Sequence, residues 1–114
     1  MKKDCIFCKI VKGEIPTNFL YKNDDLVVFR DINPHAPVHI LIVPTRHIRS
    51  VNNLTGEDAK IVSDMIMAGK MMAEKEGISK SGYKLLYNVE KGGGQVIFHL
   101  HMHLIGGWKK QLPF

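Results

Sequence analysis

Histidines alternate with apolar residues near the C-terminal end of the chain. Segment 99–104 reads His-Leu-His-Met-His-Leu, so that every second residue is a histidine: His99, His101 and His103. Because successive side chains of a β-strand point to opposite faces, this spacing predicts three imidazoles on one face and a buried apolar surface on the other. Imidazole changes charge near neutral pH, so the concentration of half of the chain's six histidines here predicts a reactive surface.

Three interpretations of this histidine segment are open. Neighbouring same-face positions of a strand lie roughly 6.5 Å apart, which is close enough for two imidazoles to share a zinc ion. Alternatively, one imidazole attacks an electrophile while the others hold its tautomer and handle the proton of the leaving group. In the third interpretation the rings are core residues bonded to the backbone, which is disfavoured because three aligned polar rings are costly to bury.

A glycine-rich turn precedes the histidines. Gly92-Gly93-Gly94-Gln95 lets the backbone approach a ligand closely and can aim several N–H groups into one concavity, which suits a phosphate. A loose hairpin loop is the alternative, although such a loop needs fewer glycines. A phosphate beside three histidines favours nucleophilic substitution at phosphorus.

Two cysteines stand three residues apart at the other end of the chain. The N-terminal residues lack the apolar stretch of a signal peptide, and no apolar run approaches the length of a membrane span. We therefore expect a cytoplasmic protein, not bound to a membrane. In a reducing compartment, the pair Cys5 and Cys8 indicates metal binding or redox activity rather than a structural disulfide.

Length and composition are those of a small globular protein. The 114 residues suffice for one compact domain, 1–114, with a single core. Apolar residues make up 45% and charged residues 24%, which excludes a disordered chain. The formal charge of +5 suits an anionic ligand, but the lysines are scattered and not interleaved with aromatic residues, so nucleic acid is not the expected partner.

The remaining patterns predict the elements that position these groups. A short helix is expected over 5–12 and a long one from the cap at Thr55 to Gly77, with its methionines in the core. Alternation and β-branched runs between turn residues predict strands over 19–22, 26–30, 38–43, 83–89 and 96–105. The fold class is therefore α+β, with one long helix laid on an antiparallel sheet of about five strands.

These motifs together resemble the histidine triad (HIT) family, and more specifically its Hint branch of nucleotide-binding hydrolases. The signature is His99 to His103 followed by Gly106-Gly107. Further matches occur in the same order over nearly the whole chain: Phe7-Cys8-Lys9-Ile10, Glu14-Ile15-Pro16, Phe29-Arg30-Asp31-Ile32-Asn33-Pro34, Ala36-Pro37-Val38-His39, Val43-Pro44-Thr45-Arg46-His47-Ile48 and Gly93-Gly94-Gln95. The resemblance implies a HIT-like fold.

The resemblance implies a catalytic group of four histidines. Family members hydrolyse nucleoside phosphoramidates in two steps through a nucleotidyl-histidine, and the middle triad residue, here His101, is the nucleophile. His103 then lies beside it at the phosphate, His39 supports proton transfer, and His99 completes the triad. Donors that stabilise the phosphoryl oxygens, together with His101 and His103, would be Asn88, Gly94 and Gln95.

The resemblance also implies a nucleoside site. Asp31 matches the carboxylate that holds the ribose hydroxyls. An apolar slot for the base would be formed by Phe7, Ile10, Ile15, Phe29 and Ile32, each of which, taken alone, is more often a core residue.

A structural zinc site is the second implication. Cys5 and Cys8 supply half of a tetrahedral site, and two imidazoles would complete it. The related galactose-1-phosphate uridylyltransferases resemble this chain in such an arrangement, which assigns His47 and His99 as the other ligands. Free thiols and redox chemistry are the alternatives, and no catalytic metal is expected.

The chain departs from the Hint pattern at several positions. Val96 replaces a serine found in several relatives, Glu90 stands where glycine is common, and Trp108 stands where arginine is frequent. The short tail after Trp108 leaves the choice of leaving group open, because in Hint proteins this segment reaches toward the partner's site.

The expected activity is hydrolysis of purine nucleoside phosphoramidates, in which AMP or GMP is joined to an amine, by a homodimer. The nearest alternative is hydrolysis of dinucleoside polyphosphates, as in the Fhit-like branch of the family. Two others are a non-catalytic nucleotide-binding regulatory module and a hydrolase with a catalytic zinc ion on all three triad histidines.

Overall fold

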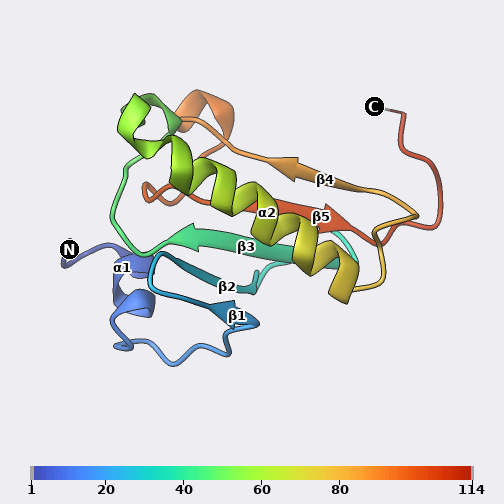
Figure 1. Cartoon of the computed structure of the whole chain (residues 1–114), viewed down its shortest axis with the longest axis horizontal. Helices are drawn as coiled ribbons and strands as arrows, with labels where there is room; N and C mark the ends of the chain where they lie inside the picture. Colours follow the sequence, from blue (N-terminus) through green and yellow to red (C-terminus); the bar gives the residue numbers. More distant parts are fainter. Residues whose placement is uncertain (1, 114) are drawn as a thin grey trace.

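The computed structural model describes residues 2–113 and confirms the α+β class. One antiparallel sheet has the strand order β1-β2-β3-β5-β4 (Figure 1). Its strands are β1 (Tyr21–Lys22), β2 (Leu26–Arg30), β3 (Val38–Pro44), β4 (Tyr83–Leu86) and β5 (Met102–Gly106). The helices are α1 (Ile6–Val11) and α2 (Ala59–Lys75), and short 3-10 turns lie at Val51–Asn53, Gly56–Asp58 and Lys91–Gly93.

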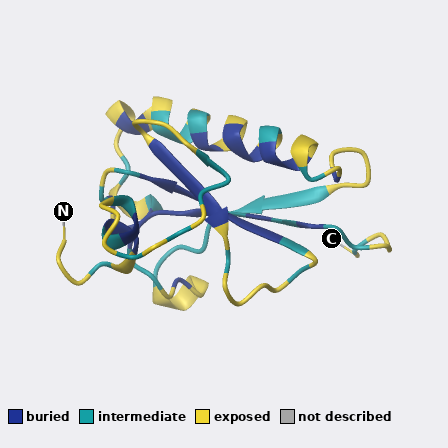
Figure 2. Cartoon of the chain, turned by 90° about the horizontal axis from the view of Figure 1, so that it is seen from below, coloured by how far each residue is buried: buried dark blue, intermediate teal, exposed yellow. Residues whose placement is uncertain are grey.

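The sheet is covered on both faces, and β3 shows this most clearly. Ile40 and Ile42 point into the cluster under α2, whereas Leu41 and Val43 point into a second cluster that includes residues of α1. A strand that is buried on both faces is apolar at nearly every position, which accounts for the run over 38–43. Figure 2 shows α2 on one side of the sheet with its buried residues turned toward the strands.

Helix α2 begins later than its cap predicts. Thr55 and Asp58 form a reciprocal capping box, but the first turn they cap is a 3-10 turn, and the α-helix starts at Ala59. Met65 and Met72 are buried in the core, as predicted for the methionines of this helix, whereas Met67 is 57% exposed and the prediction is wrong there. Within residues 2–113, no helix is long and apolar enough to span a membrane.

Three predicted strands are shorter in the structure. The first is only Tyr21–Lys22, and β4 ends at Leu86 rather than at 89. The histidine segment is the main correction: only Met102–Gly106 is strand, because the preceding backbone leaves the ladder and the Leu100 N–H donates to the Ile48 carbonyl (2.6 Å).

The side chains of the histidine segment nevertheless alternate between the two faces, both in the part that precedes β5 and within β5 itself. Leu100, Met102 and Leu104 pack in the core under α2, while His99 and His101 contact Phe7 of α1 on the other face. Phe98, just before the histidine segment, is only half-buried, and its ring centroid lies 4.3 Å from the Arg49 guanidinium carbon.

The end of β5 has no room for a side chain at Gly106. A Cβ placed there would lie 2.8 Å from Ile78 Cδ1, 3.0 Å from Tyr83 Cβ and 3.3 Å from the Gly82 carbonyl oxygen. We expect Gly106→Ala to lower the free energy of unfolding by about 1–3 kcal/mol in urea denaturation. Gly92→Ala is the matched control, since its Cβ would meet nothing within 4 Å, and an equal loss in both variants would contradict the packing explanation.

Candidate active site

Two adjoining hollows open on the α1 face of the sheet. One, of about 480 Å³, is lined by His35, His39, His101 and His103 among others. The other, of about 470 Å³, is largely apolar. Both are lined by Phe7, Asp31, Asn33, Leu41 and Ile97, so they form one continuous depression.

His101 is held in one tautomer. Its Nδ1 lies 2.7 Å from the His99 carbonyl oxygen, and since a carbonyl only accepts, Nδ1 carries the proton. The other nitrogen, Nε2, therefore keeps its lone pair, and the ring lines the hollow while remaining 9% exposed. Burial lowers the pKa of His101 below its usual value, which favours the neutral ring with a nitrogen free to attack.

His39 and His103 form a second imidazole pair. The backbone N–H of His35 donates to His39 Nδ1 (3.0 Å), so His39 carries its proton on Nε2. That Nε2 donates to His103 Nδ1 (2.9 Å), which leaves the His103 proton on its own Nε2. Burial lowers the pKa of His39, and it lowers the pKa of His103 to about 4.

Asp31, His39 and His103 each offer one potential metal-ligand atom, and these three atoms lie within 4.8 Å of one another. The Asp31 Oδ2 lies 3.4 Å from His39 Nε2. A metal on His39 Nε2 requires the proton to move to Nδ1, where it would face the N–H of His35. The hydrogen bonds therefore favour a proton rather than a metal ion at this position.

A tetrahedral metal site fits a different group, made of Cys5, Cys8, His47 and His99. The distances from sulfur to Nδ1 are 3.4 Å for Cys5–His99, 3.4 Å for Cys8–His47 and 3.6 Å for Cys8–His99, and the two Nδ1 atoms are 3.2 Å apart. Zinc–ligand bond lengths in a tetrahedron give edges of about 3.5 Å between sulfur and nitrogen and about 3.3 Å between two nitrogens. The four residues could therefore hold a metal ion, and these four distances are close to the edges of a tetrahedral site.

His99 connects this group to His101. Its Nε2 donates to the Pro44 carbonyl oxygen (2.8 Å), so the lone pair is on Nδ1, which faces the sulfur atoms. The ring is fully buried, and burial lowers its pKa to about 4. Because its carbonyl oxygen accepts from His101, one residue joins the cysteine–histidine group to the imidazole in the hollow.

Helix α1 positions the two cysteines. Cys5 is the N-cap residue, and its Sγ accepts from the Cys8 N–H at 3.3 Å. Helical spacing then brings Cys8 to the same side, where it is completely buried. Phe7 of the same helix packs edge-on against His99 and His101, at 5.8 and 5.1 Å between ring centroids.

The glycine-rich loop does not aim its N–H groups into the hollow, contrary to the prediction. The N–H of Gly94 donates to Lys91 O, and the N–H of Gln95 donates to Glu90 O. The Gln95 amide is also fully used, because Oε1 accepts from the Glu90 N–H and Nε2 donates to the carbonyls of Arg49 and Ile97. Gln95 therefore holds the loop in shape, while Gly94 lines the histidine hollow; the predicted phosphate contacts of both residues stay predictions.

Glu90 and Asn88 complete this loop. Glu90 has φ 59° and ψ 176°, a conformation that favours glycine, and its carboxylate binds Arg49 (2.9 Å) and Ser50 (2.6 Å). Asn88 Nδ2 donates to Gly93 O at 2.9 Å, which uses one of its two amide protons. Of the three predicted donors, only Asn88 lines the hollow with an amide proton still available.

The predicted base slot coincides with the apolar hollow. Its five apolar residues all line this hollow, with Phe7 edge-on to Phe29 at 5.7 Å between ring centroids. Phe7, Ile10 and Phe29 are buried, whereas Ile32 is 89% exposed and can only form the rim. Asp31 lies where the two hollows meet, with Oδ1 accepting from the Asn33 N–H and Oδ2 near His39.

His35 is a residue that the sequence reasoning missed. It is exposed in the loop between β2 and β3, lines the histidine hollow, and stacks edge-on against His39 at 5.6 Å between ring centroids. A single histidine between prolines has no periodic signal, so only its nearness to the triad in space identifies it.

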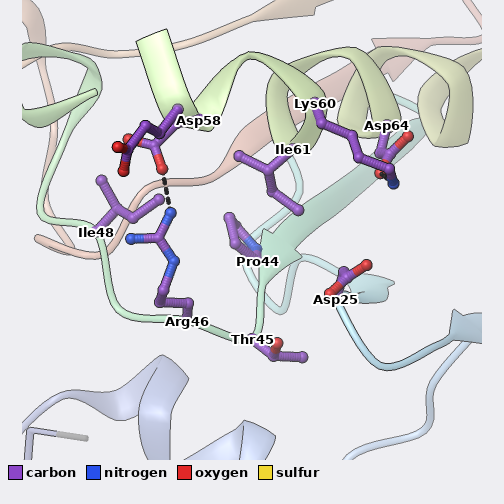
Figure 3. A pocket seen from close by; sticks show the side chains of 10 residues that line it. Asp25, Pro44, Thr45, Arg46, Ile48, Asp58, Lys60, Ile61 and Asp64 are labelled. Carbon is purple, nitrogen blue, oxygen red and sulfur yellow. Dashed lines mark hydrogen bonds and ion pairs between the residues drawn. The ribbon is translucent and has the colours of Figure 1, made fainter. Parts of the chain in front are cut away.

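A smaller hollow of about 210 Å³ lies at the start of α2 (Figure 3). Arg46 pairs with Asp58 and Lys60 pairs with Asp64 there, and Asp25 and Glu57 add two further carboxylates to the lining. It contains no histidine or cysteine, and it is not a candidate for the chemistry considered above.

Comparison with known proteins identifies the chain's relatives. The family model described as "Scavenger mRNA decapping enzyme C-term binding" matches residues 4–112. A "Purine nucleoside phosphoramidase" of Escherichia coli is 44% identical over 107 residues, which cover 94% of this chain and 90% of the relative. A HIT family hydrolase of Clostridium thermocellum superposes with a TM-score of 0.94 at 40% identity, covering 98% of this chain and 97% of the other.

A second solved structure, a HIT family hydrolase of Legionella pneumophila, superposes with a TM-score of 0.92 at 41% identity, over 96% of this chain and 98% of the other. The fold, the row of imidazoles and these relatives together define a hydrolase. The chain belongs to the histidine triad (HIT) family, as the order of its motifs predicts.

Proposed function

We propose that this hydrolase cleaves the P–N bond of purine nucleoside phosphoramidates through a nucleotide bound covalently to His101. The observation that carries this proposal is the His101 ring, whose Nδ1 is fixed on a carbonyl while its other nitrogen remains free in a hollow that continues into an apolar slot. The E. coli relative that carries the name of this activity supports the choice of substrate.

In the first step His101 Nε2 attacks phosphorus and the amine departs. The apolar slot holds the base, Asp31 lies within reach of the ribose hydroxyls, and the phosphoryl group lies over His101 and His103. The Nε2–H of His103, fixed by the hydrogen bond from His39, donates to a phosphoryl oxygen, and the Asn88 amide can do the same. In the second step, water attacks phosphorus and His101 is released.

We further propose that Cys5, Cys8, His47 and His99 hold a structural zinc ion. Sulfur and imidazole ligands suit zinc, and four protein ligands leave no open position for a substrate. When bound, zinc supplies a cross-link between α1 and the segment before β5. His99, with its ring fixed, then presents its carbonyl oxygen to His101 at the observed 2.7 Å. No catalytic metal is part of this proposal.

The pH dependence of the first step follows from the burial of His101. Only the neutral His101 ring attacks, and burial lowers its pKa. An ordinary histidine is half protonated at about pH 6.5, so the reaction should lose half of its rate only at a pH below that value. We expect the single-turnover rate with a 4-nitrophenyl ester of AMP, whose leaving group departs without a proton, to stay above half its plateau at pH 6.5. A midpoint at pH 7 or above would contradict this assignment.

Substrate comparison tests the proposed activity. We expect kcat/KM for an adenosine phosphoramidate to exceed that for diadenosine triphosphate and for the corresponding cytidine phosphoramidate. Much faster cleavage of the triphosphate would instead favour a dinucleoside polyphosphate hydrolase. Loss of turnover on removal of a metal from a protein that stays folded would favour a catalytic metal.

The biological setting is also proposed. We infer a homodimer because β4 is an edge strand that pairs with β5 alone, and a half-buried edge can pair with a second copy. The two free cysteines suit a reducing cytoplasm, where residues 1–114 would act as one domain. Light scattering of the purified protein tests the dimer, and a monomer at micromolar concentration would contradict it.

A further inference from the structure

Four imidazoles form a row that starts at His101 and ends at the protein surface. The ring centroids are 5.0 Å apart for His101–His103, 5.1 Å for His103–His39 and 5.6 Å for His39–His35. Only the last ring is exposed: His101 is 9% and His39 is 6% exposed and His103 is half-buried, whereas His35 is exposed. An in-line displacement at phosphorus expels the leaving group on the side away from the nucleophile, so the group that protonates it must lie across the hollow from His101, and His35 lines this same hollow.

The departing amine needs a proton, and the inner part of the row is poorly suited to give one. His101 commits its single N–H to the His99 carbonyl. The pair His39–His103 is held in its neutral form, because both of its lone-pair nitrogens already accept an N–H: His39 Nδ1 from the His35 backbone, and His103 Nδ1 from His39 Nε2. A proton added to His39 Nδ1 would face the backbone N–H of His35. A proton added to His103 Nδ1 would face the Nε2–H of His39.

The other polar groups of the hollow do not serve as acids either. The Asp31 carboxylate acts as an acceptor, from the Asn33 N–H at 2.8 Å and beside His39 Nε2 at 3.4 Å. Amide side chains such as Asn88 do not ionise in this range. Val96, which is 83% exposed at the edge of the hollow, has no exchangeable side-chain proton.

We propose that the exposed imidazole of His35 is the general acid that protonates the departing amine. This inference rests on the proposed phosphoramidase function. An imidazole can both give and take a proton, so one ring can act as the acid in the first step and as the base in the second. The groups that face His35 are His39 on β3, His103 on β5 and Asp31 at the end of β2, and a cation at His35 would lower the pKa of both histidines.

The step is balanced as follows. The bond between His101 Nε2 and phosphorus forms while the P–N bond breaks, and the nitrogen takes a proton from the His35 imidazolium to leave as a neutral amine. In the second step the attacking water forms the new P–O bond, His101 departs with the electron pair of its bond to phosphorus, and His35 accepts the proton that the water loses.

The dependence on the leaving group tests this inference. In single turnovers we compare AMP joined to an alkylamine, which needs a proton to leave, with the 4-nitrophenyl ester of AMP, which does not. His35→Gln keeps the backbone N–H that binds His39 but removes the acid. We expect it to slow formation of the nucleotidyl-enzyme from the amine substrate by about 10²-fold and from the ester by less than about threefold.

Single-turnover rate constants do not depend on the fraction of folded protein, so partial misfolding cannot imitate this difference. Val96→Ala is the matched control in the same hollow, and we expect it to leave the ratio of the two rates unchanged. Equal slowing of both substrates by His35→Gln, or no slowing of either, would overturn the role of His35. Absence of any nucleotidyl-enzyme in the unsubstituted protein would instead overturn the proposed function itself.

Discussion

His101→Ala is expected to reduce the single-turnover hydrolysis of an adenosine phosphoramidate by about 10⁵-fold, the largest effect of any substitution in this chain. The reason is that, of the three triad imidazoles, only His101 presents a free nitrogen lone pair to the hollow. His103 directs its own lone pair at His39, and His99 directs its lone pair at the cysteines. Rapid mixing with a labelled substrate, followed by chemical quench, measures the loss.

Binding of the product provides the control for this variant. His101 is not among the residues that line the apolar slot, so the dissociation constant of AMP should change by less than about tenfold when His101 is truncated. A regulatory module that only binds nucleotides predicts the same affinity but no difference in turnover. Retention of more than a tenth of the activity by His101→Ala would therefore remove the nucleophile from the proposed mechanism.

Loss of the zinc site is expected to have the second largest effect, and to act on stability as well as on activity. Cys8 is fully buried and its Sγ lies within 3.6 Å of both His47 and His99. We expect Cys8→Ser to reduce bound zinc from one ion per chain to well below one, and to lower the Tm by more than about 10 °C. Metal analysis and thermal unfolding of the purified proteins measure the two effects.

The unsubstituted protein treated with a chelator is the matched control for Cys8→Ser. Both proteins lack the cross-link between α1 and the segment before β5, so their Tm values should agree, and the chelator should not destabilise the variant further. The position of the His99 carbonyl oxygen should also become less defined, which slows the first step because His101 loses its fixed tautomer. A purified protein that contains no zinc and is indifferent to chelators would refute the metal assignment.

The sequence predicts the fold well where a pattern repeats. The apolar run over 38–43 predicts a strand covered on both faces, and β3 is such a strand. The alternation at 99–104 correctly divides this segment between a core face and a histidine face, although its first half lies outside the ladder. Side-chain direction depends only on an extended backbone, whereas strand assignment depends on the partner's hydrogen bonds, which the local sequence does not specify.

The candidate site is less predictable where its contacts come from distant segments. The glycines before Gln95 are typical of a ligand-binding loop, but the Gln95 amide donates to the carbonyls of Arg49 and Ile97. The carboxylate of Glu90 binds Arg49 and Ser50. Hydrogen bonds between residues about forty positions apart leave no pattern in the local sequence. The same holds for His35, whose neighbours His39 and His103 meet it only after the β2–β3 loop folds back over the sheet.

The covalent intermediate is the most direct test of the whole proposal. The unsubstituted protein is mixed with an adenosine phosphoramidate, quenched within the first turnover under conditions that preserve phosphorus–nitrogen bonds, and digested for mass spectrometry of the peptides. We expect one AMP group, attached to His101. A modified residue other than His101, or rapid hydrolysis with no modified residue at any time, would contradict the central claim.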